Sequence, residues 1–278
     1  MTTMYHAIDN PLIVQRFHKL TGLLLNILIS YNFLPGNAYK LTKLYRHMID
    51  SLALDSGAYS VYTGKANVTP SEYRRYIRRF GHLFDVIFSL DKDFNNPYDN
   101  FTTQYYLQME LPEQVRKPIP VIHDPVDPFG EFKTYADDGH TYIAIGSGKP
   151  VPDKVLHKMK TEYPDVKIHM FGKLNRKMLL EHKPYSADAS TWAIAAGNGC
   201  FYYWDEEEKK EYTIYVGDSD KTPPGKKHFN QFQNREGLEK FLREKFGWTF
   251  KDLLSGPVEN KRILNLYFFR QLEDLLKK

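Results

Sequence analysis

Short apolar runs, most of them followed by a charged amphipathic stretch, recur along the first two thirds of the chain and limit its fold more than any other feature. Each run is only a few residues long and lies next to Pro, Gly or Asp. Such runs are typical of parallel strands that are buried on both faces and connected by helices. The runs lie at residues 27–30, 52–54, 86–90, 119–122, 142–145, 167–170 and 185–187, with an eighth candidate at 200–204.

This alternation of strands and helices predicts an α/β fold. Seven or eight β/α units in about 200 residues favour a (β/α)8 TIM-type barrel, with a doubly wound parallel sheet as the alternative. We expect one barrel domain over residues 1–278, in which residues 200–278 form a β-hairpin insertion, a basic loop and C-terminal helices. Those helices are expected at residues 235–246, 249–254 and 257–278.

One helix inside the barrel region has a clear start. Thr69 is a good N-cap, Pro70 suits the first helical position, and Glu72 completes a capping box. Aromatic and aliphatic residues then recur at helical spacing, which predicts one buried face and one solvated face. The solvated face carries Arg74, Arg75, Arg78 and Arg79.

Composition excludes several classes of protein. The single cysteine, Cys200, excludes an internal disulfide framework and a zinc subdomain that needs several cysteines. A net charge of +4 means that a nucleic acid would have to be bound by a local basic patch. Residues 20–34 are apolar but too short and too polar to span a bilayer, and the N-terminus has no basic secretory segment. A cytoplasmic protein without membrane contact, metal or cofactor is therefore the expectation.

Three aspartates follow apolar runs directly. In a barrel, the carboxyl ends of the strands form the functional face, so Asp55, Asp91 and Asp188 are expected on one rim. A carboxylate at such a position is costly to bury without a partner or a task, although aspartate is also a common helix N-cap. Paired carboxylates can divide the roles of nucleophile and general acid, as in glycosyl transfer.

Glycines also follow several of the predicted strands. Gly57, Gly146, Gly148 and Gly172 either permit turns with positive φ or let backbone amides approach a flat ligand. Tyr59 either stacks on a ring or fills the core. The sequence alone leaves both alternatives open.

At these strand ends the chain resembles the tRNA-guanine transglycosylases, (β/α)8 barrels that exchange guanine for a 7-deazaguanine base. Residues 55–59 resemble the Asp-Ser-Gly-Gly-Tyr/Phe segment of that family, and residues 88–91 resemble its Phe-Asp segment. Residues 144–148 are similar to its Ala-Val-Gly-Gly-Leu segment, and residues 169–172 to its Leu-Met-Gly-Val-Gly segment. Residues 186–188 fall where the family carries its nucleophilic aspartate.

The resemblance implies a role for each of the three aspartates. Asp188 would attack the sugar C1′ and displace guanine, which gives a covalent glycosyl-enzyme intermediate. Asp55 would act as general acid or base on the leaving and incoming bases, and Asp91 would accept hydrogen bonds from the guanine edge. The other base-binding residues that it implies are Ser56, Gly57, Tyr59, His123, Gly146, Gly148, Met170, Phe171 and Gly172.

The chain departs from the tRNA enzymes in ways that bear on the substrate. It is shorter, and Cys200 alone cannot supply their Cys-x-Cys-x-x-Cys…His zinc site. It is more similar to the DNA 7-deazaguanine transglycosylases of phages and bacterial DNA-modification clusters. Their nucleophile segment reads Ser-x-Asp-x-Ser-x-Trp, which matches Ser186, Asp188, Ser190 and Trp192.

The resemblance therefore implies exchange of guanine in DNA for a free 7-deazaguanine base such as 7-cyano-7-deazaguanine. A tRNA substrate, a non-catalytic nucleic-acid-binding partner subunit and an unrelated barrel hydrolase with two carboxylates remain alternatives. A homodimer or a partner protein is also left open.

Basic residues near the predicted strand ends, on the arginine-rich helix and in the loop after the hairpin would neutralise DNA phosphates and make binding salt-dependent. For the helix, a purely solvated face is the competing interpretation. The candidate DNA-binding residues are Arg74, Arg75, Arg78, Arg79, Lys149, Lys173, Arg176, Lys177, Lys221, Lys226 and Lys227.

Overall fold

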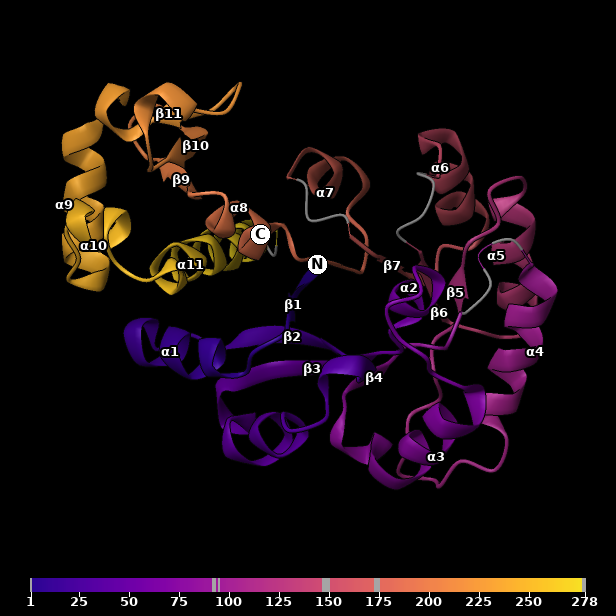
Figure 1. The fold of residues 1–278 in the computed structure, drawn as a ribbon. Helices are drawn as coiled ribbons and strands as arrows, with labels where there is room; N and C mark the ends of the chain where they lie inside the picture. Colours follow the sequence, from indigo (N-terminus) through magenta and orange to yellow (C-terminus); the bar gives the residue numbers. More distant parts are fainter. Residues whose placement is uncertain (1, 92–93, 95, 147–150, 173–175, 277–278) are drawn as a thin grey trace. The chain divides into compact units, whose positions relative to one another are not determined.

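The computed structural model describes residues 2–91, 94, 96–146, 151–172 and 176–276. The chain divides into two compact units (Figure 1). The first comprises Met1–Pro11, Leu25–Ala189 and Leu276–Lys278, and the second comprises Leu12–Leu24 and Ser190–Leu275. Each unit contains its own sheet, eight-stranded in the first and three-stranded in the second.

The first unit is an α/β unit built on one curled parallel sheet. Its strand order is β4-β3-β2-β1-β8-β7-β6-β5, so the first and last strands of the unit are neighbours. A parallel bridge between Phe88 and Ile119 links the segments at the two edges of the sheet. The strands are β1 (Thr3–Ile8), β2 (Leu25–Ser30), β3 (Ile49–Asp55), β4 (Val86–Ile87), β5 (Val121–Ile122), β6 (Tyr142–Ile145), β7 (Lys167–Met170) and β8 (Ser186–Ala189).

This strand order is that of a TIM-type barrel rather than of a doubly wound sheet. A doubly wound sheet reverses its order at a switch point, whereas here every strand pairs with its neighbour in sequence and β1 pairs with β8. The α/β class and the TIM-like arrangement expected from the sequence are therefore confirmed.

The strand that the sequence pattern misses is β1. Its six residues mix Thr3, Tyr5 and His6 with apolar residues, so it lacks the apolar run that marks the other strands. The eighth candidate, residues 200–204, is a strand, but it belongs to the hairpin of the second unit and not to the eight-stranded sheet. Counting it as a barrel strand was wrong.

Alternation along the strands decides which side chains reach the interior of the sheet. Leu28, Ala53, Val121 and Ala144 belong to one buried apolar cluster, and register pairs Leu28 with Ala53 and Val121 with Ala144. Since side chains alternate along a strand, the residue two positions further on faces the same side. At the carboxyl ends of the strands, this rule places Asp55, His123 and Gly146 on the interior side. Asp188 is placed in the same way, because it lies two positions after Ser186, and Ser186 pairs with His169, the partner of Ala144.

The helices of the first unit follow its strands. The capping box of α3 is present as expected: the Glu72 N–H donates to Thr69 Oγ1 at 3.2 Å, and the Thr69 N–H donates to the Glu72 carboxylate at 3.0 Å. The helices are α2 (Ala58–Tyr62), α3 (Pro70–Phe80), α4 (Pro97–Gln108), α5 (Pro128–Asp137), α6 (Asp153–Glu162) and α7 (Arg176–His182).

The second unit contains the hairpin and the C-terminal helices that the sequence predicts. Strands β9 and β10 are antiparallel, and β11 pairs with β10 in parallel. Its elements are α1 (Leu12–Thr21), α8 (Thr191–Gly197), β9 (Cys200–Asp205), β10 (Lys210–Tyr215), β11 (Lys227–His228), α9 (Arg235–Phe246), α10 (Phe250–Leu254) and α11 (Val258–Leu276). None of the helices in the described parts of the chain has the length and apolar character needed to cross a membrane.

Asn265 connects three elements of the second unit and gives a test of its packing. Its buried amide donates to the Trp192 carbonyl at 2.7 Å, and its carbonyl oxygen accepts the Tyr202 N–H at 2.8 Å. We expect Asn265→Ala to lower the free energy of unfolding by about 2–4 kcal/mol, because these backbone groups lose their partner inside the protein. Urea denaturation measures the loss. The control is Asn198→Ala at an exposed position, which should change the free energy of unfolding by less than about 0.5 kcal/mol. An equally small change for Asn265→Ala would contradict this account.

Candidate active site

The carboxyl ends of the parallel strands bring the three predicted aspartates within electrostatic range of one another. Asp55 ends β3, Asp188 lies in β8, and Asp91 follows β4; the last two are each only 6% exposed. Burial, together with the charges of Asp91 and Asp188, raises the pKa of Asp55 from 3.8 to about 7. A carboxyl of this kind exists in both protonation states near neutral pH, which suits proton transfer.

Asp55 has a well-defined local setting. The Gly57 N–H donates to Asp55 Oδ2 at 3.1 Å, which partly offsets the rise in its pKa. Gly57 has φ of +81°, and a Cβ at this position would collide with the Asn32 side chain. The glycine is thus required by the backbone itself, and its amide is used by Asp55 rather than kept for a ligand.

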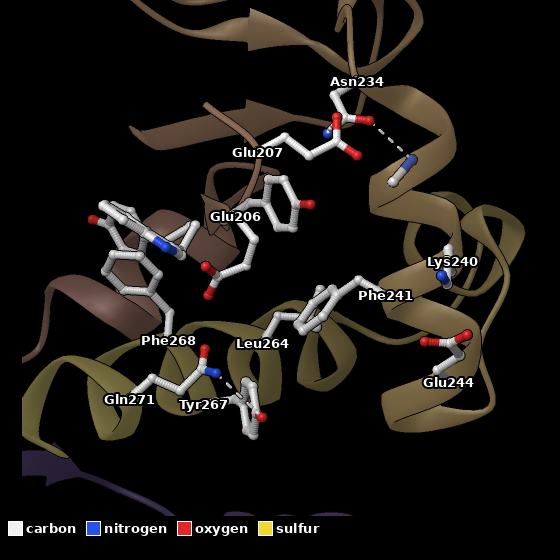
Figure 2. Close-up of a pocket in the computed structure, with 14 residues that line it drawn as sticks. Glu206, Glu207, Asn234, Lys240, Phe241, Glu244, Leu264, Tyr267, Phe268 and Gln271 are labelled. Atoms are coloured by element: carbon white, nitrogen blue, oxygen red, sulfur yellow. Dashed lines mark hydrogen bonds between the residues drawn. The ribbon is translucent and has the colours of Figure 1, made fainter. Parts of the chain in front are cut away.

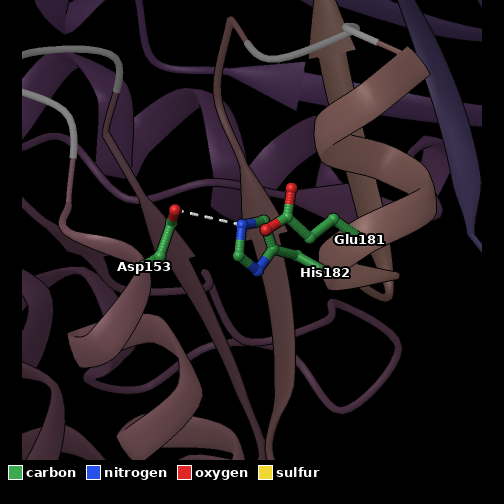
Figure 3. A group of neighbouring side chains, drawn as sticks. All are labelled: Asp153, Glu181 and His182. Atoms are coloured by element: carbon green, nitrogen blue, oxygen red, sulfur yellow. Dashed lines mark hydrogen bonds and ion pairs between the residues drawn. The ribbon is translucent and has the colours of Figure 1, made fainter.

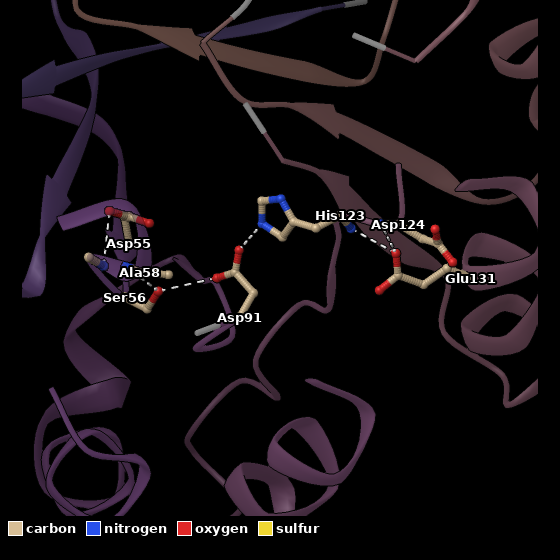
Figure 4. A network of polar contacts seen from close by, with 8 residues as sticks. Asp55, Ser56, Ala58, Asp91, His123, Asp124 and Glu131 are labelled. Atoms are coloured by element: carbon tan, nitrogen blue, oxygen red, sulfur yellow. Dashed lines mark hydrogen bonds and ion pairs between the residues drawn. The ribbon is translucent and has the colours of Figure 1, made fainter. Parts of the chain in front are cut away.

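Asp91 is held at both of its oxygens (Figure 4). His123 Nε2 is hydrogen-bonded to Asp91 Oδ2, and the buried Ser56 hydroxyl donates to Oδ1 at a long 3.5 Å. The structure therefore brings together three of the residues expected to bind a base. The Ser56 contact is the weaker of the two and is the one that a ligand could replace.

His123 is fixed by close packing. A Cβ on Gly146 would overlap the His123 ring, so glycine is required there for the ring to fit. On another side Phe94 stacks on the imidazole with centroids 3.9 Å apart and an interplanar angle of 12°, and Tyr62 stacks on Phe94 at 4.5 Å. The sequence gives no sign of this stack, because Tyr62, Phe94 and His123 come from three separate strand-end segments.

Glu131 supports the same corner of the site from helix α5. Its carboxylate accepts the backbone N–H groups of His123 and Asp124, each at 2.7 Å. Burial raises the pKa of Glu131, and these two hydrogen bonds oppose the rise. The residue was not singled out from the sequence, and its position in a helix gives no signal of this function.

Asp188 is held at one oxygen. The Gly172 N–H donates to Oδ1 at 3.1 Å, and His169 Nε2 lies 3.4 Å from the same atom. In the part of the chain that the structure describes, no hydrogen bond or ion pair reaches Oδ2. The sequence predicted Gly172 for this site but gave His169 no role.

The remaining predicted base-binding residues lie in different surroundings. Tyr59 is 60% exposed on α2, whereas Met170 is buried. Phe171 packs on the barrel core, 4.7 Å from the Phe88 ring and 4.5 Å from that of His169. No contact between Tyr59 and Met170 is recorded among the described residues, so the structure does not bring them together as two sides of a slot for a base. Gly148 lies outside those residues.

The predicted DNA-binding residues are spread over both units. On α3, Arg74 and Arg78 lie 3.5 and 3.4 Å from the Glu110 carboxylate, while Arg75 and Arg79 are exposed. Arg176 and Lys177 begin α7 in the first unit, and Lys149 and Lys173 lie outside the described residues. In the second unit, Lys221, Lys226 and Lys227 are all exposed.

The described residues also contain features that the sequence did not indicate. A cavity of about 330 Å³ in the second unit is lined by aromatic side chains together with Glu206, Glu207 and Glu244 (Figure 2). A hollow of about 590 Å³ opens at the amino ends of the parallel strands, opposite the aspartates. Its lining includes Asp50, Asp85, Arg116, Lys117 and Lys167.

One group of side chains has the composition of a metal site. Asp153, Glu181 and His182 offer ligand atoms within 4.8 Å of one another, and His182 Nε2 lies 3.1 Å from Asp153 Oδ1 (Figure 3). Asp153 and Glu181 are exposed, and the three residues belong to helices α6 and α7. They stand apart from the three strand-end aspartates in the chain, and no contact joins the two groups among the described residues.

Comparisons with known proteins support the fold. No protein-family model matches the chain, and no curated protein sequence matches it. A solved structure from Coccidioides immitis, provisionally assigned as a fructose-1,6-biphosphate aldolase, matches with a TM-score of 0.57 and 13% identity, over 98% of this chain and 89% of that chain. The YdjI aldolase from Escherichia coli K12 matches with a TM-score of 0.47 and 8% identity, over 70% of this chain and 78% of that chain. At such identities the first likeness shows a shared fold alone.

The raised pKa of Asp55 predicts how stability depends on pH. Since its folded-state pKa of about 7 lies above the unfolded value of 3.8, the ionised carboxylate destabilises the folded state. The penalty is absent below about pH 4, grows up to pH 7 and is complete above it. Asp55→Asn should therefore raise the free energy of unfolding at pH 8, by up to about 4 kcal/mol, and change it little at pH 4.

Urea denaturation at the two pH values measures the difference. The exposed Asp50→Asn is the matched control, because Asp50 lies at the opposite end of the same strand. An Asp55→Asn variant that differs from the wild type equally at both pH values would contradict the assignment of a raised pKa.

Proposed function

We propose that this protein is a transglycosylase that exchanges guanine in DNA for a 7-deazaguanine base such as 7-cyano-7-deazaguanine. The observation that carries the proposal is the pairing of two different carboxyl groups at the strand ends. Asp55 has a pKa of about 7, so it keeps its proton below this pH, and the charge of Asp188 contributes to the rise of its pKa. A carboxyl that keeps its proton near neutral pH, with a second carboxyl in electrostatic range, suits the acid and the nucleophile of glycosyl transfer.

In the proposed reaction Asp188 Oδ2 attacks C1′ of the target nucleotide as the glycosidic bond breaks. The bond's electron pair leaves with guanine, which takes up the proton of Asp55. The covalent glycosyl-Asp188 ester is then attacked by N9 of the incoming base, whose proton returns to Asp55. Each base exchange is thus balanced without a cofactor, and the carboxylate charge stabilises the oxocarbenium-like sugar of each transition state.

Asp91 is proposed to select the base. Guanine and 7-deazaguanine present an N1–H and an exocyclic amine on the same edge, and a carboxylate oxygen accepts from such donors. Base binding would replace the 3.5 Å contact from Ser56, while His123 keeps Asp91 Oδ2 in place. The closely packed His123 then fixes the orientation of the selecting carboxylate.

Support for DNA as the polymer comes from the resemblance and from charge. The segment with Ser186, Asp188, Ser190 and Trp192 fits the DNA-directed relatives, and Cys200 cannot build the zinc site of the tRNA enzymes. The exposed Arg75 and Arg79 offer phosphate contacts in the first unit. The target nucleotide would have to leave the base stack to reach the buried carboxylates.

One incubation tests the proposal directly. We expect the purified protein, duplex DNA and 7-cyano-7-deazaguanine to yield a 7-deazaguanine deoxynucleoside, detected by mass spectrometry after nuclease digestion. A parallel reaction with unmodified tRNA should yield none. A modified ribonucleoside from tRNA alone would transfer the protein to the tRNA branch. Failure of both polymers to incorporate the base or to exchange labelled guanine would overturn the transglycosylase proposal.

Asp188→Asn separates chemistry from binding. We expect it to lower the rate of guanine exchange by about 10³-fold or more, because an amide cannot form the glycosyl ester. DNA affinity, measured by fluorescence anisotropy at a fixed salt concentration, should change little. The exposed Asp153→Asn is a control that should keep the wild-type rate. Full exchange activity in Asp188→Asn would exclude it as the nucleophile.

A further inference from the structure

A chain of buried polar groups runs through the interior of the eight-stranded sheet to Asp188. The Tyr142 hydroxyl lies 2.5 Å from Ser186 Oγ, and Ser186 Oγ lies 2.6 Å from His169 Nδ1. His169 Nε2 then lies 3.4 Å from Asp188 Oδ1. His169 and Ser186 are both fully buried. Since a buried polar group is costly unless it is paired, this chain is a constraint that the fold maintains and not an incidental contact.

The proton positions in this chain are set at its end, where His169 Nε2 faces the Asp188 carboxylate and a hydrogen on Nε2 is favourable. With that hydrogen on Nε2, Nδ1 is the acceptor in the 2.6 Å contact with Ser186 Oγ. The Ser186 hydroxyl then accepts from the Tyr142 hydroxyl, which keeps its hydrogen because burial raises its pKa above the ordinary value of 10.0. Each donor in the chain then has an acceptor.

The other tautomer of His169, with its hydrogen on Nδ1, is electrostatically unfavourable. If Nδ1 carried the only hydrogen, the lone pair of Nε2 would face the carboxylate of Asp188 inside the protein. His169 Nε2 is buried and makes no hydrogen bond in the described parts of the chain, so the Asp188 carboxylate 3.4 Å away is the group that its hydrogen would face. At 3.4 Å the contact is long for a hydrogen bond, as contacts in sites without substrate often are, and it can shorten on binding.

We propose that His169 is a positioning residue that holds Asp188 by an Nε2–H donor and leaves Oδ2 directed at the reacting carbon; its part in the reaction rests on the function proposed above. The Gly172 N–H and His169 Nε2–H converge on Oδ1 from two sides. The imidazole is itself fixed by the Phe88 and Phe171 rings, each with its centroid 4.5 Å away. Rigid support of this kind keeps a nucleophile at attack geometry without contact between His169 and the substrate.

The tautomer is tested without any activity measurement. In protein labelled with 15N-histidine, the His169 signals are identified among those of the 10 histidines by their loss in His169→Gln. We expect a protonated Nε2 and an unprotonated Nδ1 near neutral pH. Ser186→Ala should weaken this preference, because Nδ1 then loses its donor. A hydrogen on Nδ1 in the wild type, alone or together with one on Nε2, would overturn the proposed direction of the chain.

The positioning role is tested by two substitutions at His169. The amide nitrogen of Gln can replace the Nε2–H donor, whereas Leu keeps similar bulk and removes it. In single-turnover release of guanine from DNA, we expect His169→Leu to lower the rate at saturating DNA by about 10–100-fold with little change in the DNA concentration giving half the maximal rate. His169→Gln should recover most of the rate.

The outcomes separate this inference from the proposed function. If the wild-type protein shows the expected tautomer but releases no guanine, the transglycosylase proposal and the positioning role of His169 are both overturned. The hydrogen-bond chain itself is then still supported. A working wild-type enzyme with an undiminished rate in His169→Leu would overturn the positioning role alone. Equal rate losses in the Gln and Leu variants, in step with equal losses of stability, would also overturn it.

Discussion

The parallel register of the eight-stranded sheet is the constraint on which the rest of the site depends. Ser30 pairs with Asp55 across β2 and β3, and Tyr5 pairs with Asp188 across β1 and β8, so the register fixes the position of each carboxylate in the sheet. Because side chains alternate, a register shift of one residue in β3 or β8 would turn its carboxylate away from the interior. The tightly packed apolar layer around Ala53 and Ala144 penalises such shifts, so the packing of the core also determines the geometry of the chemistry.

Glycine at defined positions lets this crowded rim form. The ring of His123 occupies the space that a side chain at position 146 would need, and Gly57 adopts a backbone conformation that other residues rarely tolerate. From the sequence, both glycines either permit turns with positive φ or let backbone amides approach a flat ligand. In the structure Gly146 makes room for the His123 ring, and the Gly57 N–H donates to Asp55.

Local signals in the sequence were sufficient for most elements and for the grouping of the three aspartates. The capping box at Thr69, the helix from Arg235 and the apolar strands all depend on residues close in sequence. Strand β1 could not be recognised in this way, because its burial comes from β2 and β8, which are distant partners in the chain. The stack on His123 was missed for the same reason, since no local pattern records which side chains meet across strand ends.

The three carboxylates differ in what surrounds them, and this difference assigns their chemistry better than their positions do. Asp91 is paired with His123, and Asp188 receives the Gly172 N–H beside His169. Asp55 receives the backbone N–H of Gly57, no contact with a histidine is recorded for it among the described residues, and it is the carboxyl whose pKa rises to about 7. Three charges so close together are most easily accommodated when one group stays protonated. The fold therefore favours a proton on Asp55, the carboxyl that the proposed reaction uses as its acid.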